Sequence, residues 1–432
     1  MRWGLLALFV AGCGGPPELT VCVRTAPDDH PFSFDPPPTS MRLRAIPLSG
    51  PEVIRSVDAA ADEVRLPPLD LGPWVFVLEV LRDEALLATG RTPLVEVTRD
   101  MNRTPCLYLA SVGTFGGAAD PDPSAGRFAV PEPGSATALV LTDTGLQRYD
   151  HETGAFGSER LAATTGSGTV WVRLPDSRAA AIGDAGAHVL EEGRVEPVRS
   201  AATGLDGAAG IAAGVDSVLL VGGASGPDAT PQPEASVRVL DLATGTTEVL
   251  PGAFPVRDAR LAALGNGRFV AVGGNSGTDA APVPSDLLAV VDPVDGVLAE
   301  SSLDVPRMGH AIAVVEGNIL VFGGRGADGG LLSAIERFRL ASGQPVHAAQ
   351  PQSMTAPRAG LVAIVVGEDV LLAGGEAADA EVAAASEIFR FALNGTEPAD
   401  PPGAALPDPA AVTLHDGSVL VVGGGSAVVY RP

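Results

Sequence analysis

The sequence predicts an all-β protein built from repeated small sheets, and three observations support this prediction. Of the 432 residues, 53 are glycine and 38 are proline, whereas aromatic residues make up only 4%. Many short apolar runs lie between these turn-forming residues, which is typical of β proteins rather than helical ones. Over the second half of the chain, a glycine pair recurs about every 50 residues. We therefore expect two regions, residues 19–112 without the pairs and residues 113–432 with the repeat.

The repeat is defined by glycine pairs that each end a short apolar run. The pairs are Gly222-Gly223, Gly273-Gly274, Gly323-Gly324, Gly374-Gly375 and Gly423-Gly424, at spacings of 51, 50, 51 and 49 residues. Because glycine lacks a Cβ, the pairs would let the chain turn tightly at a strand end and let neighbouring units approach. A period near 50 residues with four short strands per unit is typical of a β-propeller.

Two units carry a resemblance to a known family. The segments PRMGHAIAVVEGNILVFGG (306–324) and PRAGLVAIVVGEDVLLAGG (357–375) resemble the kelch motif, of which the diglycine is the hallmark. The tryptophan of kelch repeats is missing here, and Phe156 stands near its place. The resemblance covers residues 113–432, closely over 205–432 and weakly before. It implies a kelch-type β-propeller of seven blades, with six blades as the alternative.

The ends of the repeat region differ from its middle. Residues 127–160 and 169–198 form two degenerate units without glycine pairs, and the last unit, 405–432, contains only three strands. A ring must not leave an unpaired strand edge. We therefore expect the run CLYLASV (106–112) to supply the missing fourth strand.

Residues 19–112 are expected to form an Ig-like antiparallel β-sandwich. MRLRAI (41–46) alternates apolar and polar residues, so one face of that strand would be buried, and Trp74 is expected to anchor the core. Cys22 and Cys106 lie in the first and last runs. If the chain is exported, they would form a disulfide, worth about 4–5 kcal/mol for a loop of this length in the chain-entropy model.

The N-terminus predicts export and lipidation. MRWGLLALFVAGC has one arginine, a short apolar stretch and then Cys13, which is the layout of a secretory signal. Its end resembles the bacterial lipobox, which implies a signal peptide (1–12), a lipid-modified Cys13 and a tether (13–18). Gly14 resembles the residue at that place in lipoproteins of the outer membrane. The alternative is an ordinary signal peptide in which Cys13 has no role.

Charge and composition exclude several classes of partner. The formal net charge is −24, and every basic residue other than histidine is arginine. Such acidity disfavours nucleic acid and electrostatic docking on anionic membranes. The lipid anchor is then the only expected membrane contact, and we expect a monomer.

One motif points to a nucleotide, but its context does not. Gly324, Gly326 and Gly329 spell G-x-G-x-x-G after an apolar run, as in dinucleotide-binding loops. Such a loop must open a helix, whereas the equivalent segments of other units contain prolines and strand-like runs. We therefore expect residues 333–340 to form a strand and expect no cofactor.

No catalytic or metal-binding constellation is visible in the sequence. The six histidines are scattered, without H-x-H or H-E-x-x-H spacing. Among kelch-type propellers, copper radical oxidases need a Tyr–Cys crosslink, and residues 113–432 contain no cysteine. We expect no enzyme activity of that kind.

One set of charged residues is a candidate ligand face. An aspartate follows four of the glycine pairs, and an arginine lies 16 residues before three of them; the set is Asp228, Arg257, Asp279, Arg307, Asp328, Arg358 and Asp379. If strands alternate within each blade, these loops share one face. They would form either a polar funnel for a ligand or structural bonds within and between blades.

The function expected from these observations is that of an envelope-anchored lipoprotein that binds or scaffolds a protein or glycan without catalysis. The alternative is a sugar-processing enzyme of the mutarotase or lyase kind, acting in the propeller funnel. A purely structural envelope protein is a third possibility, because fold alone does not decide function.

Overall fold

The computed structural model describes residues 21–25, 34–60, 66–67, 69–98, 106–132, 135–143, 145–161, 169–176, 178–184, 186–191, 194–198, 202–226, 228–231, 236–348, 352–378, 385–399 and 405–432. Over these residues the regular elements are β-strands and none is a helix, which confirms the all-β prediction. In particular, the described residues contain no helix with the length and apolar character needed to cross a membrane.

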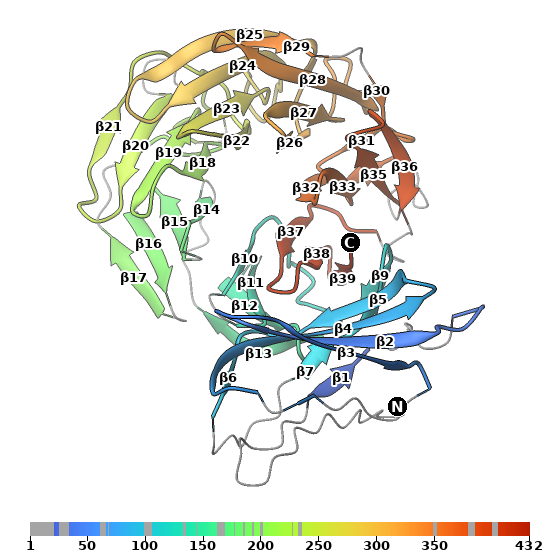
Figure 1. Ribbon diagram of the computed structural model, residues 1–432. Coiled ribbons are helices and arrows are strands. Elements are labelled where there is room, and N and C mark those ends of the chain that lie inside the picture. The colour runs from blue at the N-terminus through green and yellow to red at the C-terminus, as the bar shows by residue number, and fades with distance from the viewer. Residues whose placement is uncertain are drawn as a thin grey trace.

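Residues 115–430 build seven antiparallel sheets, numbered here in chain order, that follow one another around a central opening (Figure 1). Sheet 1 contains β10 (Ala129–Pro131), β11 (Thr137–Thr142), β12 (Gly145–Asp150) and β13 (Ala155–Leu161). Sheet 2 contains β14 (Val170–Arg173), β15 (Ala179–Gly183), β16 (Gly186–Glu191) and β17 (Arg194–Val198). These two sheets are the units that lack glycine pairs.

The next three sheets carry the full repeat. Sheet 3 contains β18 (Ala209–Ala212), β19 (Ser217–Val221), β20 (Val237–Asp241) and β21 (Thr247–Val249). Sheet 4 contains β22 (Arg260–Gly265), β23 (Arg268–Val272), β24 (Ser285–Asp292) and β25 (Gly296–Arg307). Sheet 5 contains β26 (Ala311–Val315), β27 (Asn318–Phe322), β28 (Ala334–Ala341) and β29 (Gln344–His347), with the short β30 (Gln352–Ser353) also paired to β28.

The last two sheets complete the circle. Sheet 6 contains β32 (Val362–Val366), β33 (Asp369–Ala373), β35 (Ser386–Arg390) and β36 (Gly395–Ala399), and beside it β31 (Arg358–Ala359) pairs with β34 (Glu376–Ala377). Sheet 7 contains β37 (Ala410–Thr413), β38 (Val419–Gly423), β39 (Ser426–Tyr430) and, as its fourth strand, β9 (Phe115–Gly117). β9 pairs antiparallel with β39, so Phe115 lies opposite Tyr430.

The origin of this fourth strand corrects one prediction. It comes from the N-terminal side of the repeat, as expected, but from residues 115–117 and not from 106–112. Residues 106–112 have other partners: β7 (Cys106–Tyr108) pairs in parallel with β1 (Cys22–Arg24), and β8 (Ala110–Ser111) pairs with β5 (Ala85–Arg91). The disulfide and the N-terminal sheet hold this segment, so the next few residues close sheet 7.

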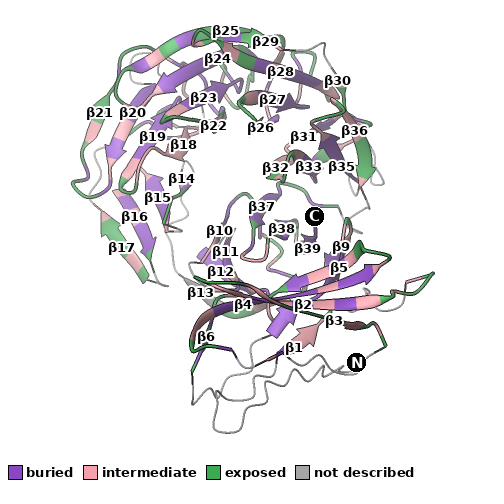
Figure 2. Cartoon of the chain, in the orientation of Figure 1, coloured by how far each residue is buried: buried purple, intermediate pink, exposed green. Residues whose placement is uncertain are grey.

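Burial follows the position of each strand within its sheet (Figure 2). The second strand of four successive sheets, 3 to 6, has the same pattern of one half-buried residue followed by four buried ones. The outermost strands are more exposed, as in β17 and β21. The apolar clusters lie between neighbouring sheets, for example between sheets 3 and 4, where Leu219 and Phe269 belong to one cluster. The core is therefore divided among the junctions between sheets.

The glycine pairs bring neighbouring sheets together through backbone contacts. Gly222 has φ +71°, and a Cβ there would lie 1.8 Å from the carbonyl oxygen of Val256. In four pairs the second glycine donates its N–H to a carbonyl of the following unit; the bonds run from Gly223 to Val256 (3.1 Å), Gly274 to Arg307 (3.0 Å), Gly324 to Arg358 (2.7 Å) and Gly375 to Leu406 (2.9 Å). A side chain would block this approach, so each junction needs glycine.

The N-terminal region is a separate β unit. One sheet contains β3 (Val53–Asp58), β2 (Ser40–Pro47), β4 (Gly72–Arg82), β5 and β8 in that order, with β6 (Val95–Val97) also paired to β4. The β1–β7 pair packs on it, since Leu107 shares a core cluster with Leu43 and Phe76. Trp74 lies in the same cluster and is 6% exposed, so its predicted anchoring role is confirmed.

The predicted disulfide is present. Cys22 and Cys106 are bonded, with their Cα atoms 4.4 Å apart and 84 positions between them in the sequence. The bond joins the first described strand to the segment that leads into the ring. It therefore holds β1 against β7 within the N-terminal region, a few residues before the chain enters β9.

Candidate functional site

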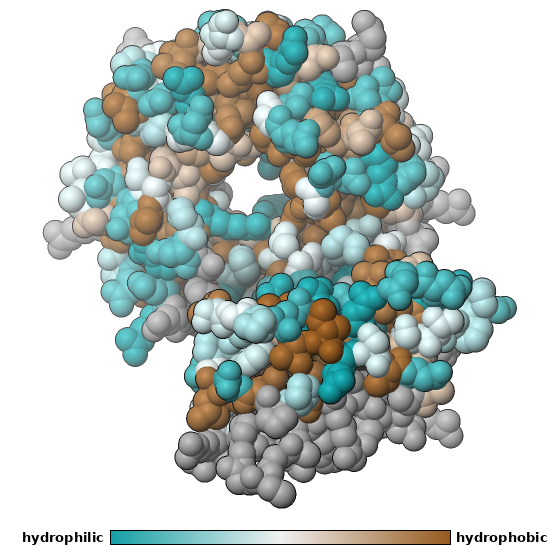
Figure 3. All heavy atoms as spheres, viewed as in Figure 1, coloured by the Kyte–Doolittle hydropathy of each residue, from teal (hydrophilic) through white to brown (hydrophobic). Residues whose placement is uncertain are grey.

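The central opening passes between the first strands of the sheets, and the space-filling view shows it as a hole through the molecule (Figure 3). First strands of neighbouring sheets contact one another, as β18 contacts β22 and β22 contacts β26. These strands have no partner strand on the side of the opening. Backbone edges therefore surround the opening.

Two arginines extend from these inner strands. Arg173 ends β14 and donates a hydrogen bond to the carbonyl of Ala411 in sheet 7. Arg260 begins β22, and its Nε donates to the carbonyl of His310 at 3.0 Å. Both residues are exposed, yet the surrounding protein lowers the pKa of Arg260 and lowers that of Arg173 to about 10. Both guanidinium groups are therefore surrounded by protein while their residues remain exposed to water.

The structure brings Arg257 next to Asp279, a second residue of the predicted ligand face. It is 2% exposed, pairs with Asp206, and lies 3.1 Å from Asp279 (Nη2 to Oδ1). Asp206 was missed in the sequence, although it stands 16 residues before Gly222, the place that arginine takes in the next three units. The position of Asp206 in the repeat was therefore the signal that could have identified it.

Arg307 and Arg358 lie inside the protein rather than on its face. Arg307 is 0% exposed; its Nη1 donates to the carbonyls of Gly323 (2.9 Å) and Ala334 (3.0 Å), and its Nη2 pairs with Glu336. Burial lowers its pKa, and Glu336 opposes that shift. These bonds hold the glycine turn to the third strand of the same sheet, which is a structural role.

Arg358 repeats this arrangement one sheet later. Its Nη1 donates to the carbonyl of Ala385 at 2.5 Å, and its Nη2 lies 3.7 Å from Oε1 of Glu387. Burial again lowers the arginine pKa, against the effect of Glu387. Glu336 and Glu387 both stand 13 residues after the first glycine of their pair, a register that the sequence shows and that our sequence reasoning missed.

The predicted aspartates are not gathered into one site. Asp228 and Asp328 are exposed, and Oδ1 of Asp328 accepts the N–H of Gly330 at 2.9 Å, which is turn chemistry. Asp379 lies outside the described residues. Of the seven predicted residues, the structure therefore shows one contacting pair, Arg257 with Asp279.

A different set of charges lies around the start of the inner strand β22. Asp258 follows Arg257; burial raises the pKa of its carboxyl, Asp279 and Asp206 add to the rise, and Arg257 and Arg260 oppose it. Its N–H donates to the carbonyl of Gly207 at 2.6 Å, which joins sheets 3 and 4.

The rim continues on sheets 7 and 1. The charge of Asp408 acts to raise the pKa of Arg260, and its Oδ2 lies 3.1 Å from Nη2 of Arg127. Asp258, Asp408 and Arg127 have φ of 54°, 44° and 62°, a conformation that costs free energy for residues other than glycine and is often found at functional sites. We name the set Asp206, Asp258, Asp279, Asp408, Arg127 and Arg260 the channel rim.

A buried polar network lies where the ring closes. Nε2 of His151 (sheet 1) lies 2.7 Å from Oδ2 of Asp416 (sheet 7), and that oxygen accepts Nη1 of Arg431 at 2.6 Å. Arg431 also donates to the carbonyl of Tyr108 in the N-terminal region at 2.8 Å. Burial would raise the pKa of Asp416, but His151 and Arg431 outweigh it and hold the pKa well below its usual range. We name His151, Asp416 and Arg431 the closure network.

Ser418 makes this network look like a hydrolase triad, but the geometry is different. Its hydroxyl donates to Oδ1 of Asp416 at 2.5 Å, and the same hydroxyl lies 3.4 Å from Nε2 of His151. The serine and the aspartate therefore meet the same imidazole nitrogen, whereas a triad uses both nitrogens in series. All three side chains are buried, so a substrate has no access to them.

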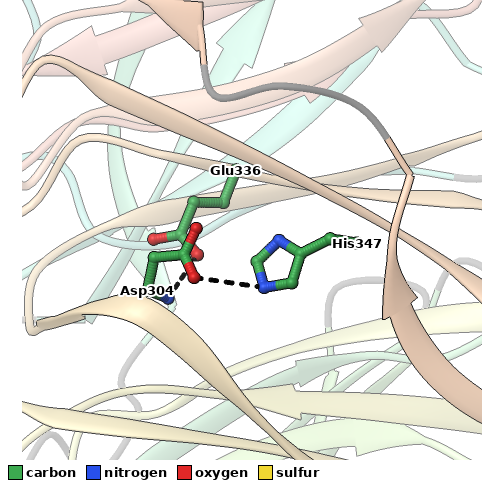
Figure 4. A group of neighbouring side chains, drawn as sticks. All are labelled: Asp304, Glu336 and His347. Carbon is green, nitrogen blue, oxygen red and sulfur yellow. Dashed lines mark hydrogen bonds and ion pairs between the residues drawn. The ribbon is translucent and has the colours of Figure 1, made fainter.

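A third group combines Asp304, Glu336 and His347 on the outer part of sheets 4 and 5 (Figure 4). One potential ligand atom from each lies within 4.8 Å of those of the other two. Asp304 and His347 are exposed and Glu336 is buried. Sequence reasoning saw only scattered histidines, because the three residues come from three strands of two sheets.

The glycine-rich loop is not arranged as a phosphate cradle. The strand β28 follows it, as predicted for residues 333–340, and no helix opens there. The loop amides are used internally: Gly326 donates to the carbonyl of Gly330 at 2.9 Å, and Gly329 donates to that of Gly326 at 3.0 Å. Gly324 donates across the sheet junction, so the fingerprint is coincidental.

Comparison with known proteins adds no assignment. No model of a known protein family matches the chain, and no curated protein sequence matches it. The kelch resemblance therefore depends on the repeat residues of this sequence alone. The predicted lipidation residue, Cys13, lies outside the described residues.

Proposed function

We propose that residues 113–432 form a kelch-like seven-bladed β-propeller, that residues 19–112 form an Ig-like β-sandwich, and that the whole is a non-enzymatic binding module of the bacterial envelope. The observation that carries this proposal is the circle of seven sheets, six of four strands and one of five, whose last member is completed by β9. In this interpretation each sheet is one blade, and β9 pairs the first part of the ring with the last.

The channel rim is the proposed binding surface. Backbone bonds between neighbouring sheets hold two parts of it, from Asp258 to Gly207 and from Arg127 to Asp408, so a ligand would meet a preformed arrangement. Four carboxylates and two guanidinium groups offer many acceptors and several charged donors. This mixture suits the hydroxyls of a glycan or the polar groups of a protein, and the net acidity of the rim disfavours a polyanion.

The anchor is proposed to be a lipid on Cys13. The cysteine follows an apolar stretch of signal-peptide type, and the disulfide between Cys22 and Cys106 agrees with an oxidising compartment outside the cytoplasm. The outer membrane is the expected location. Mass spectrometry of the N-terminal peptide tests this: we expect a diacylglycerol mass on Cys13 and release of the Cys13→Ala variant from membranes, whereas an unmodified Cys13 contradicts the anchor.

A ligand screen tests the binding function. The detergent-solubilised protein is applied to a glycan array and, separately, cross-linked in intact envelopes and analysed by mass spectrometry. We expect a reproducible ligand whose affinity falls at least 10-fold in Asp258→Asn and Arg260→Gln variants, with Asp328→Asn as the exposed control. A ligand whose affinity is unchanged in both rim variants would contradict binding at the rim.

The same preparation tests the alternative function. Mutarotase or lyase action on a sugar would require carboxylate and arginine groups beside the substrate, and the rim contains both. NMR of anomeric exchange and ultraviolet detection of unsaturated products would reveal either reaction. Turnover that is lost in Asp258→Asn would replace the binding proposal by an enzyme.

A further inference from the structure

The group formed by Asp304, Glu336 and His347 has the composition and spacing of a metal site. Oδ1 of Asp304 and Nε2 of His347 are 3.4 Å apart. Two ligands at about 2.0–2.1 Å from one tetrahedral ion are separated by roughly 3.4 Å. The remaining carboxylate, that of Glu336, lies beside both of them (Figure 4).

The charge of the group leaves room for a cation. Glu336 forms an ion pair with Arg307, and its Oε2 accepts the N–H of Asp304 at 2.7 Å. A carboxylate oxygen has two lone pairs, so Oε2 keeps acceptor capacity after that bond. With Arg307 counted, the two carboxylates leave a net charge of about −1 before the histidine is considered. A divalent cation is attracted to such a site.

Sheet 6 provides an internal comparison. There Glu387 faces Arg358, and the N–H of Thr355 donates to Oε2 of Glu387 at 2.7 Å, as the N–H of Asp304 does to Glu336. Thr355 therefore takes the place of Asp304. The buried glutamate and its backbone donor belong to the frame that both sheets share.

The histidine position can be compared in the same way. Phe338 pairs with His347 in sheet 5, and the equivalent Phe389 pairs with Thr396 in sheet 6. The frame thus forms with two threonines, and sheet 5 differs by an aspartate and a histidine that both face the buried glutamate. The aspartate and the histidine are therefore not needed to build the frame, so their shared position beside the glutamate indicates a ligand.

The imidazole is oriented and the site is open. The ring of His347 packs against that of Phe338 in a tilted arrangement, with 4.3 Å between centroids, which restricts its rotation. The side chains of Asp304 and His347 are 55% and 40% exposed, so an ion can enter and keep a water molecule.

We propose that Asp304, Glu336 and His347 bind one divalent transition-metal ion, with Zn²⁺ as the best fit and water in the fourth position. One nitrogen and two carboxylate ligands with an open position suit Zn²⁺ better than Ca²⁺ or Mg²⁺, which take six or more oxygens. The ion would join the last strand of sheet 4 to sheet 5. This site is distinct from the channel rim and does not depend on the proposed function.

Metal titration of the full-length protein tests the proposal. After chelator treatment and buffer exchange, Zn²⁺ is added in a calorimeter, and bound metal is counted by elemental analysis after gel filtration. We expect one ion per chain with a micromolar or lower Kd, and Co²⁺ in its place should give the intense visible absorption of a four-coordinate ion. A wild-type protein that retains no stoichiometric Zn²⁺ would overturn the proposal.

The variants follow from sheet 6. Asp304→Thr and His347→Thr introduce the residues that the equivalent frame already holds, so both should fold with an unchanged circular dichroism spectrum. We expect each to weaken Zn²⁺ binding at least 10-fold and the double variant to abolish it. His188→Thr and Asp328→Thr, which change the same residue types elsewhere, should bind as the wild type does. Full binding by the double variant overturns the site.

Discussion

Two kinds of junction hold the ring together, and they differ in how the sequence encodes them. Between sheets 3, 4, 5, 6 and 7 the same parts recur: a glycine pair that accepts a close backbone approach and, in sheets 5 and 6, a buried arginine paired with a glutamate. Where sheet 7 meets sheet 1, a glycine pair is again present, Gly423-Gly424, and a Cβ on Gly126 would lie 2.6 Å from the carbonyl oxygen of Asp408, but the buried arginine there, Arg431, pairs with an aspartate. The junction there uses β9 and the closure network.

The difference indicates that repetition specifies a single sheet but not the closure of the circle. A repeated junction joins residues that are close in sequence and can form as soon as two units exist. The closing junction joins residues 265 positions apart, His151 and Asp416, and takes a carbonyl from the N-terminal region through Arg431. The N-terminal region is thereby part of the closure.

The largest expected effect comes from breaking a repeated junction. Arg307→Ala leaves Glu336 buried without its cation, and losing one partner of a buried ion pair costs about 3–5 kcal/mol. We expect a correspondingly lower Tm and lower urea midpoint. Arg390→Ala, which removes surface ion pairs with Asp369 and Glu397, should cost about 1 kcal/mol or less. Equal losses in the two variants would show that the buried pair has no special weight.

Breaking the closure should have a pH-dependent effect. The pKa of Asp416 is held well below its usual value, so its ion pairs stabilise the folded protein above about pH 4 and lose that effect as the pH falls through the folded pKa. Asp416→Asn should cost roughly 3 kcal/mol at pH 7. The gap between wild type and variant should narrow in urea titrations below pH 4; a constant gap would mean that the charge does not matter.

Removal of the disulfide tests whether closure of the ring depends on the N-terminal region. Replacing Cys22 and Cys106 by serine should cost about 2–5 kcal/mol, since the bond closes a long loop. If the N-terminal region is part of the closure, hydrogen exchange should speed up in β9 and β39 as well as in β1 and β7. Protection of β9 and β39 that stays at the wild-type level would show that the ring closes independently.

A smaller effect is expected at the histidine between sheets 4 and 5. Burial, with Arg260 and Arg307, holds the pKa of His310 well below its usual value, so the folded state excludes a proton that the unfolded state binds below about pH 6.5. Stability should fall as the pH drops from 7 to 5. In His310→Leu this contribution to the pH dependence should be absent. It amounts to up to about 1–2 kcal/mol of the free energy of unfolding. His188→Leu is the control and should keep the slope.

The smallest effect is expected at Asp328, the exposed residue that completes a turn. Asp328→Ala removes one bond to Gly330 and should lower stability by about 0.5 kcal/mol or less. A loss above 2 kcal/mol in thermal unfolding would show that this loop contributes to the junction between sheets.

The sequence predicted what depends on local pattern. The glycine pairs, the alternation in 41–46 and the strand at 333–340 all follow from residues within one unit, and the structure has them. The closing strand was placed a few residues too early, because the competition of β1 and β5 for residues 106–112 depends on tertiary contacts.

The candidate sites were less predictable, for the same reason. The arginine register was visible, but its partners Glu336 and Glu387 lie on another strand, and only the fold shows that the arginines point inward. Asp304 and His347 meet through adjacent sheets, at no motif spacing. The rim depends on positive-φ turns at Asp258 and Asp408, which no residue pattern indicated.

The long sequence separation between β9 and β39 also determines when β9 can pair during synthesis of the chain. Gly117 and Val428, which pair in sheet 7, are 311 positions apart. At about 5–20 residues per second, synthesis leaves β9 without its partner for roughly 15–60 s. During that interval its backbone donors and acceptors are open to any other strand. The synthesis of β39 therefore decides when β9 can be covered by its partner.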